Sequence, residues 1–234
     1  MMRLTGDGKM IRFLLAGMMA TGFLNAADPE WDAFKAKTLV HQHEAQGWCT
    51  KEKAEKMMDL IYEVQPSVCV EIGVFGGSSI YPTAKALKYL GGGVVYAIDP
   101  WAKEDCQEGY DPNDPNYIWW SSINLDDIYK GFLYLLKKHR LEDFCEPLRM
   151  TSEEALSFFE DGSIDILHVD GNHTSEVALS DAEMWFPKVV SGGYIWFDDV
   201  NWASTAKAVT YLREKCEVDY SRSVGRECLL FKKP

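Results

Sequence analysis

Four side chains able to bind a metal or transfer a proton lie in two short stretches of the sequence. Asp170 and His173 occur within segment 168–173, and the pair Asp198-Asp199 follows a later apolar run. Carboxylate oxygens are preferred ligands of hard cations such as Mg²⁺, and imidazole can accept a proton near neutral pH. We therefore predict a divalent metal, Mg²⁺, on Asp170, Asp198 and Asp199, with Asp170 and His173 as catalytic residues. The alternatives are that one of Asp198 and Asp199 caps the next helix while the other faces solvent, and that His173 is a surface or helix-capping histidine.

A glycine-rich stretch forms a second candidate site, at Val70-Glu71-Ile72-Gly73-Val74-Phe75-Gly76-Gly77-Ser78-Ser79. Glycines let the backbone approach a ligand, a helix N-terminus favours anionic groups, and Glu71 adds an acceptor for an ammonium group. Asp99 follows Gly73 by 26 residues, and its carboxylate could accept both hydroxyls of a ribose. The alternative is that Asp99 caps a turn before Pro100. This spacing predicts a site for a zwitterionic cofactor that carries a nucleoside.

Alternating strands and helices must position these side chains. Strands are predicted at Val68–Val74, Val94–Asp99, Glu146–Met150, Ile164–Val169 and Tyr194–Phe197, and helices at Ser79–Leu90, Leu125–His139, Glu176–Val189 and Thr205–Lys215. A final hairpin is predicted from Val218–Ser221 and Cys228–Lys232. This order predicts an α/β fold with a doubly wound, mostly parallel, seven-stranded Rossmann-like sheet and a C-terminal antiparallel hairpin. Ligands of such sheets bind beyond the carboxyl ends of the strands, where Ser152 also falls.

The segments outside these strands and helices contain fewer residues that indicate structure or function. Residues 28–66 are predicted to form an N-terminal helical cap, with Thr50 capping its second helix, and residues 67–234 form the main domain. Residues 102–122 read as a long loop rich in Asp, Pro and aromatic residues. That loop could be a lid over the site, or its tryptophans could anchor it to the core.

Four segments together carry a resemblance to a known family: Val70–Ser79, Ile98–Trp101, His168–His173 and Phe197–Asp199. They resemble class I S-adenosylmethionine-dependent methyltransferases. Within this class the similarity is closest to metal-dependent O-methyltransferases of antibiotic sugars, such as the macrocin type. The resemblance covers roughly residues 68–232 and leaves the cap and the N-terminal segment outside.

The resemblance implies a cofactor site for S-adenosylmethionine on Glu71, Gly73, Gly76, Ser78, Asp99 and Ser152. Glu71 and Gly73 would line its methionine end, and Asp99 would hold the ribose. The catechol-type relatives have a lysine where this chain has His173, and usually Asp-Asn where it has Asp198-Asp199. These departures make a catechol substrate doubtful.

The function expected from these features is transfer of a methyl group to a hydroxyl of a small molecule or sugar, assisted by a divalent metal. Two alternatives are a nicotinamide-dependent oxidoreductase and a non-catalytic binding domain on the same fold. The glycine spacing lacks the G-x-G-x-x-G pattern, which counts against the first.

Composition limits the partners of the chain. A formal net charge of −12 over 234 residues argues against nucleic-acid binding through phosphates. Within residues 1–27, an apolar run at Phe13–Leu24 follows Lys9 and Arg12, as in a secretory signal. This segment is either a signal or membrane tether, or an amphipathic or disordered extension of a cytosolic enzyme. The second alternative is supported by the cofactor, which is made in the cytosol. A homo-oligomer is compatible with the sequence.

Overall fold

The computed structural model describes residues 28–234, so the signal or tether predicted for residues 1–27 lies outside the described chain. The strands are β1 Val68–Ile72, β2 Val94–Asp99, β3 Cys145–Arg149, β4 Ile164–Val169, β5 Val189–Phe197, β6 Glu217–Val218 and β7 Leu229–Lys232. The α-helices are α1 Pro29–Val40, α2 Lys51–Val64, α3 Ile80–Leu90, α4 Lys103–Cys106, α5 Pro115–Ser122, α6 Leu125–His139, α7 Ser152–Ala155, α8 Ser175–Trp185 and α9 Ala206–Lys215. Short 3-10 turns occur at Gln42–Glu44, Leu156–Phe158 and Phe186–Lys188.

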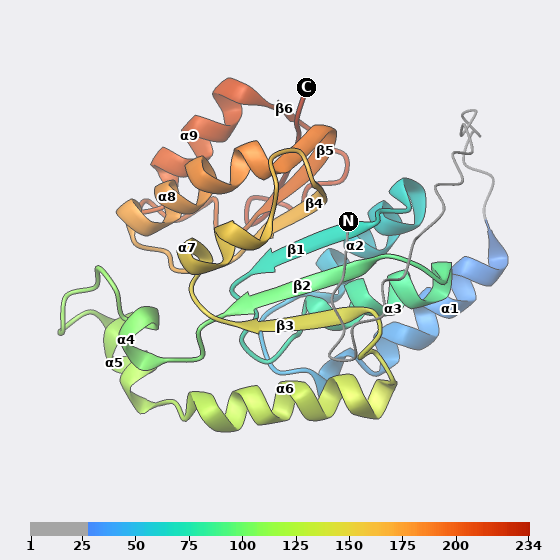
Figure 1. Ribbon diagram of the computed structural model, residues 1–234, viewed down its shortest axis with the longest axis horizontal. Coiled ribbons are helices and arrows are strands. Elements are labelled where there is room, and N and C mark those ends of the chain that lie inside the picture. Colours follow the sequence, from blue (N-terminus) through green and yellow to red (C-terminus); the bar gives the residue numbers. More distant parts are fainter. Residues whose placement is uncertain (1–27) are drawn as a thin grey trace, which may run out of the picture.

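The seven strands form one sheet in the order β3-β2-β1-β4-β5-β7-β6 (Figure 1). The strands from β3 to β5 in this order pair in parallel, and β7 is antiparallel to both β5 and β6. This arrangement confirms the predicted doubly wound sheet with an antiparallel C-terminal hairpin. Strands β2 and β3 are added on one side of β1, and β4 and β5 on the other side. The loops that follow β1 and β4 therefore lead in opposite directions and leave a crevice between them.

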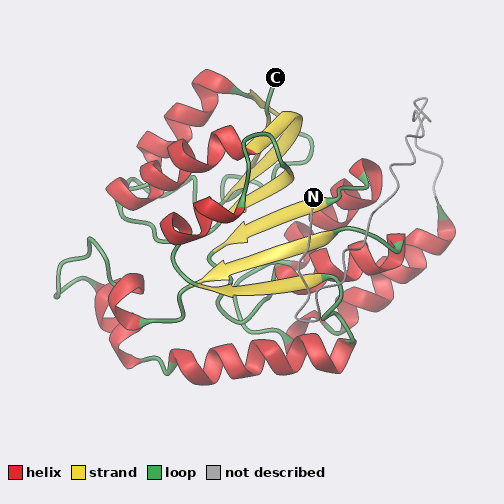
Figure 2. Ribbon diagram, viewed as in Figure 1, coloured by secondary structure: helices red, strands yellow, loops and turns green. Residues whose placement is uncertain are grey.

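Helices cover both faces of the sheet (Figure 2). Helices α1, α2, α3 and α6 share one buried cluster with strand residues such as Cys69, and α7, α8 and α9 share the other with Val68, Val70 and Ile72. Alternate residues of β1 therefore point to opposite faces, as the period of a strand requires. Glu71 accordingly points to the same face as Cys69, toward the N-terminal helices.

The N-terminal helices pack directly on this face of the sheet. The Thr50 hydroxyl oxygen accepts a hydrogen bond from the Lys53 amide at 3.2 Å, which caps α2 as predicted. The buried Met57 and Met58 of α2 belong to the same cluster as the core residues of α3. The α2 helix is thus held firmly beside the carboxyl ends of the strands.

Three expectations for secondary structure were wrong. Residues 102–122 are not a continuous loop but contain α4 and α5, and Asp114 caps α5 ahead of Pro115 at its first position. This Asp-Pro pair is a helix-start signal that the aromatic composition concealed. The predicted helix Glu176–Val189 ends at Trp185, because Pro187 cannot continue it, and β5 begins at Val189 instead of Tyr194.

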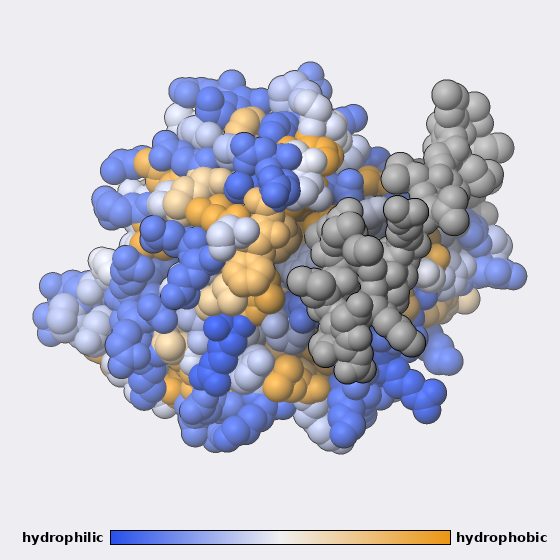
Figure 3. All heavy atoms as spheres, viewed as in Figure 1, coloured by the Kyte–Doolittle hydropathy of each residue, from blue (hydrophilic) through white to orange (hydrophobic). Residues whose placement is uncertain are grey.

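The surface is largely polar. Figure 3 shows hydrophilic side chains over most of one face, with apolar ones gathered toward its middle. Among residues 28–234, no helix combines the length and apolar character needed to span a bilayer. The six cysteines are free thiols.

Candidate active site

A cavity of about 590 Å³ lies at the carboxyl ends of β1, β2, β4 and β5, and α2 contributes to its wall. Eight of the ten predicted site residues line it: Gly73, Ser78, Asp99, Ser152, Asp170, His173, Asp198 and Asp199. Glu71 and Gly76 do not line it. The predicted cofactor residues and the predicted acidic cluster therefore meet in one space.

Gly73 allows two loops to approach each other at the base of this cavity. Its φ is +82°, and a Cβ there would lie 2.0 Å from the Asp170 carbonyl oxygen. Any side chain at this position would push the ends of β1 and β4 apart. Gly76 instead lies against Gln46, where a Cβ would meet the Gln46 Cβ at 2.5 Å.

Asp99 holds the glycine loop in place. One carboxylate oxygen accepts hydrogen bonds from the Val74 and Phe75 amides at 3.0 and 2.9 Å, and the other accepts from the Trp101 amide at 2.7 Å. Burial raises the pKa of Asp99, and these three amides oppose the shift. Since a carboxylate offers roughly four acceptor positions, Asp99 retains capacity for a hydroxyl in the cavity. The bond to the Trp101 amide caps the turn before Pro100, which was the alternative role for Asp99, whereas the bonds that brace the glycine loop were not visible in the sequence.

Glu71 lies beneath the cavity. Its side chain is buried, with the residue 1% exposed, and accepts a hydrogen bond from the Ser79 hydroxyl at 2.5 Å. Its other carboxylate oxygen is 3.0 Å from Nδ1 of His168. Glu71 therefore supports His168 and the start of α3, and its predicted contact with the cofactor stays a prediction.

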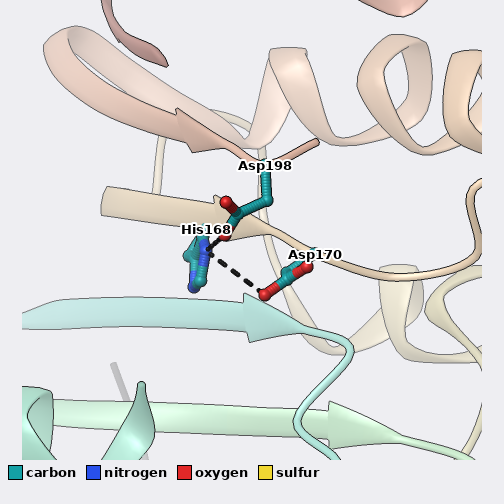
Figure 4. Close-up of side chains that lie close together, drawn as sticks. All are labelled: His168, Asp170 and Asp198. Atoms are coloured by element: carbon teal, nitrogen blue, oxygen red, sulfur yellow. Dashed lines mark hydrogen bonds and ion pairs between the residues drawn. The ribbon is translucent and has the colours of Figure 1, made fainter. Parts of the chain in front are cut away.

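The imidazole of His168 lies next to the carboxylates of Asp198 and Asp170 (Figure 4). Nε2 of His168 hydrogen-bonds Oδ2 of Asp198 at 2.9 Å and lies 3.9 Å from Oδ2 of Asp170. Candidate ligand atoms of His168, Asp170 and Asp198 lie within 4.8 Å of one another, as do those of Asp170, His173 and Asp199. Neither set contains all three predicted metal ligands, because Asp198 belongs to one set and Asp199 to the other, and the two share Asp170.

Lys53 enters this cluster from α2. Its ammonium Nζ hydrogen-bonds Oδ2 of Asp198 and lies 3.4 Å from Oδ2 of Asp170. Burial lowers the pKa of Lys53, but the negative charge of Asp170, with a smaller contribution from Glu71, outweighs this effect and raises the pKa. In turn, burial would raise the pKa of Asp170, but Lys53 and the two histidines hold it well below its usual range.

The residues in this arrangement do not fit a divalent ion. The Asp198 oxygen that would bind a metal already contacts an ammonium and an imidazole, and the space between Asp198 and Asp170 holds Nζ of Lys53. Mg²⁺ requires near-octahedral oxygen ligands, which a cation between the carboxylates prevents. In the alternative donor set of Asp170, His173 and Asp199, Nε2 of His173 already lies 2.9 Å from Oδ2 of Asp199, so these two atoms contact each other.

His173 faces two carboxylates at the wall of the cavity. Its Nε2 lies 2.9 Å from Oδ2 of Asp199 and 3.8 Å from Oδ1 of Asp170, and its ring packs on Trp202 with centroids 4.9 Å apart. Burial lowers the pKa of His173, but the two carboxylates overcome this and raise it to about 9. The contact with Asp199 orients the His173 imidazole and stabilises its protonated form.

Asp181 is a buried acid in the cavity wall that sequence reasoning did not identify. It is 2% exposed, and it accepts a hydrogen bond from the Ser152 hydroxyl at 2.5 Å. Burial raises the pKa of Asp181 to about 6, and this hydrogen bond only partly opposes it. Its place within α8 gave no sign that it would face the site.

Replacing Asp181 by Asn should change how stability depends on pH. An acid with a higher pKa in the folded chain binds its proton more readily when folded, so stability falls as pH rises from about 4 to about 6. Relative to wild type, D181N should gain about 1–3 kcal/mol in free energy of unfolding at pH 7, with no gain at pH 4. Urea denaturation across this range measures the difference. Equal gains at both pH values, or D181N behaving like the exposed control D143N, would show that Asp181 is not the responsible group.

Aromatic side chains crowd one side of the cavity. Trp48 is 69% exposed, and its ring lies 5.1 Å from that of Phe75 and 5.4 Å from that of Trp119 by centroid. Trp120 adds a fourth ring, 4.7 Å from Trp119. A planar or ring-shaped molecule could stack on this surface.

Comparison with known proteins agrees with this fold. A family model described as a methyltransferase domain matches residues 70–200. An uncharacterised protein of Sinorhizobium fredii is 28% identical over 145 residues, which is 61% of this chain but 14% of that protein's length. This chain therefore spans only a small part of the curated relative that it matches.

Solved structures share the fold at low identity. The O-methyltransferase NovP has a TM-score of 0.66 at 16% identity, covering 87% of this chain and 98% of that chain. The Podospora anserina methyltransferase PaMTH1, solved with S-adenosylhomocysteine bound, has a TM-score of 0.59 at 13% identity, covering 92% and 100%.

The family model extends over more than half of the chain, so the protein belongs to this methyltransferase-domain family. Together with the sheet, it confirms the predicted class, the class I S-adenosylmethionine-dependent methyltransferases. The sugar-modifying, metal-dependent branch stays a prediction.

Proposed function

We propose that this protein transfers a methyl group from S-adenosylmethionine to a hydroxyl group of a small molecule or sugar. The observation that carries the proposal is the single cavity, which joins the glycine loop and Asp99 to the cluster around Asp170 and His173. The cofactor assignment is supported by PaMTH1, which binds S-adenosylhomocysteine, and transfer to oxygen by NovP, an O-methyltransferase.

The cofactor would lie across the carboxyl ends of β1 and β2. Gly73 leaves room for it at the turn, and Asp99 offers its remaining acceptor capacity to the ribose. Ser152 and Asp181 line the same cavity and form a polar pair suited to the exocyclic amine of adenine. The sulfonium end would then extend toward Asp170.

The transfer step needs alignment and removal of one proton. The acceptor oxygen uses a lone pair to form the new O–CH₃ bond, while the S–CH₃ bond breaks and its electron pair returns to sulfur, giving neutral S-adenosylhomocysteine. The hydroxyl proton leaves to Nε2 of His173, which lies 2.9 Å from Oδ2 of Asp199 and must be unprotonated to accept it. Because the pKa of His173 is raised to about 9, turnover should rise with pH up to about that value. No redox co-reactant is required.

Assistance by Mg²⁺ on Asp170, Asp198 and Asp199 stays a prediction from the sequence. Because the donor set does not fit a divalent ion with Lys53 in its present place, no step is assigned to a metal.

Calorimetric titration of the full chain tests the proposal. S-adenosylhomocysteine should bind with one site per chain, and NADH should give no heat of binding. Absence of binding by both S-adenosylhomocysteine and S-adenosylmethionine would refute the proposed function.

Replacing Trp48 by Ala should weaken binding of the acceptor. Loss of one stacking ring is expected to raise KM for the acceptor about 3- to 10-fold, with little change in affinity for the cofactor. An acceptor found by screening with radiolabelled S-adenosylmethionine provides the assay. Y134A removes an equally exposed ring on α6, away from the cavity, and should leave KM unchanged. Equal KM values for W48A and wild type would exclude Trp48 from the acceptor site.

A further inference from the structure

Lys53 projects from a rigidly held part of the chain. It lies in the first turn of α2, where Thr50 caps the helix through the Lys53 amide. The following turns bury Ala54, Met57 and Met58 against the sheet. The position from which the lysine side chain extends is therefore fixed by both capping and packing.

The Lys53 side chain ends inside the cavity. The residue is 6% exposed, and lysine is almost never buried to this degree unless it is paired. Within residues 28–234 its ammonium makes hydrogen bonds to Asp198 and Asp170. An ammonium carries three N–H donors, so one remains for an oxygen in the cavity that Lys53 lines.

The carboxylate oxygens that a metal between Asp170 and Asp198 would use already face a cation. Oδ2 of Asp198 and Oδ2 of Asp170 both contact the Lys53 ammonium. A divalent ion placed between them would lie next to that ammonium in a largely buried space. Bringing like charges close together in such surroundings is strongly unfavourable.

We propose that the Lys53 ammonium takes the place of a divalent metal between Asp170 and Asp198 and binds the oxygen of the methyl acceptor. The inference rests on the proposed function, because it identifies the group that holds the acceptor in the same cavity. A fixed cation beside the acceptor oxygen stabilises the negative charge that develops as the hydroxyl loses its proton. The bonds made and broken are those of the transfer step above, with Lys53 keeping its own proton throughout.

A purely structural lysine, which only fastens α2 to the sheet, leads to different behaviour. Replacing it by methionine would then weaken folding, and Mn²⁺ would not repair catalysis. If Lys53 takes the place of a metal, K53M frees the oxygens of Asp170 and Asp198, and a divalent ion can enter and supply the missing charge.

Mn²⁺ binding followed by electron paramagnetic resonance tests the proposal without relying on turnover. Wild type should show no stoichiometric binding of Mn²⁺, whereas K53M should bind one ion about 10- to 100-fold more tightly. K51M, at an exposed lysine of the same helix, should behave as wild type. In the methyl-transfer assay, wild type should keep its turnover in EDTA, and K53M should lose turnover and regain it with Mn²⁺.

Stoichiometric Mn²⁺ binding by wild type, or loss of wild-type turnover in EDTA, would overturn the proposal. A folded K53M that gains no Mn²⁺ binding would also overturn it, and K53Q replaces K53M if the latter does not fold. Calorimetry with S-adenosylhomocysteine on the same samples separates the two claims. Failure to bind this cofactor product contradicts the methyltransferase function, whereas the Mn²⁺ result bears on Lys53 alone.

Discussion

Replacing Asp99 by Ala is expected to unfold the cofactor loop and to abolish binding of S-adenosylhomocysteine. The substitution leaves the amides of Val74, Phe75 and Trp101 without their acceptor in a buried region. We expect a loss of about 3 kcal/mol or more in free energy of unfolding, because unsatisfied buried donors cost about 1–3 kcal/mol each. For a chain of this size the melting temperature should fall by about 6–12 °C. Calorimetry and thermal unfolding monitored by circular dichroism measure the two effects.

Two variants control this experiment. D99N keeps one carbonyl oxygen as an acceptor, so it should fall between wild type and D99A in both stability and affinity. D143A removes an exposed carboxylate and should match wild type. Full cofactor affinity in D99A would show that neither the carboxylate nor the loop it braces is needed for binding.

Replacing His173 by Gln should have the largest effect on catalysis. Gln cannot serve as the proton acceptor beside Asp199, and loss of general acid–base assistance typically lowers turnover about 10²- to 10⁴-fold. Affinity for S-adenosylhomocysteine should change little, because the imidazole faces Asp170 and Asp199. Turnover with radiolabelled cofactor and calorimetry on the same protein give both values.

The matched control is H43Q, at an exposed histidine next to α1, which should retain wild-type turnover. Equal turnover in H173Q and wild type would remove His173 from the mechanism. A parallel loss of turnover and cofactor affinity would instead assign the histidine to the structure of the cavity.

Much of the fold could be predicted because its signals are local. Strands such as Ile164–Val169 and helices such as Leu125–His139 carry a clear apolar pattern and occur where the sequence places them. The topology of parallel sheets then places Asp99 and Asp170 at one edge. Local errors arose where two signals competed, as at Asp114-Pro115, where a helix start lies among aromatic residues.

The part of the site that could not be predicted from the sequence depends on contacts between residues far apart in the chain. Lys53 and Asp198 are 145 positions apart, and nothing near Lys53 in the sequence distinguishes it from a solvated lysine on a capped helix. Asp181 likewise belongs to a helix whose orientation only the packed fold defines. Glu71 lies beside the glycines in the sequence, which suggested a ligand contact, and the alternation of β1 places it beneath the cavity. Its contact with the cofactor stays a prediction.

A crystal structure of the full chain with S-adenosylhomocysteine bound tests the central claim most directly. That claim is that one cavity brings the reactive sulfur of the cofactor to an oxygen held beside Lys53 and His173. The account predicts the ribose next to Asp99, and the sulfur directed toward the space between Lys53 and His173. Density for the ligand outside this cavity, or a sulfur directed away from the Asp170 cluster, would contradict it.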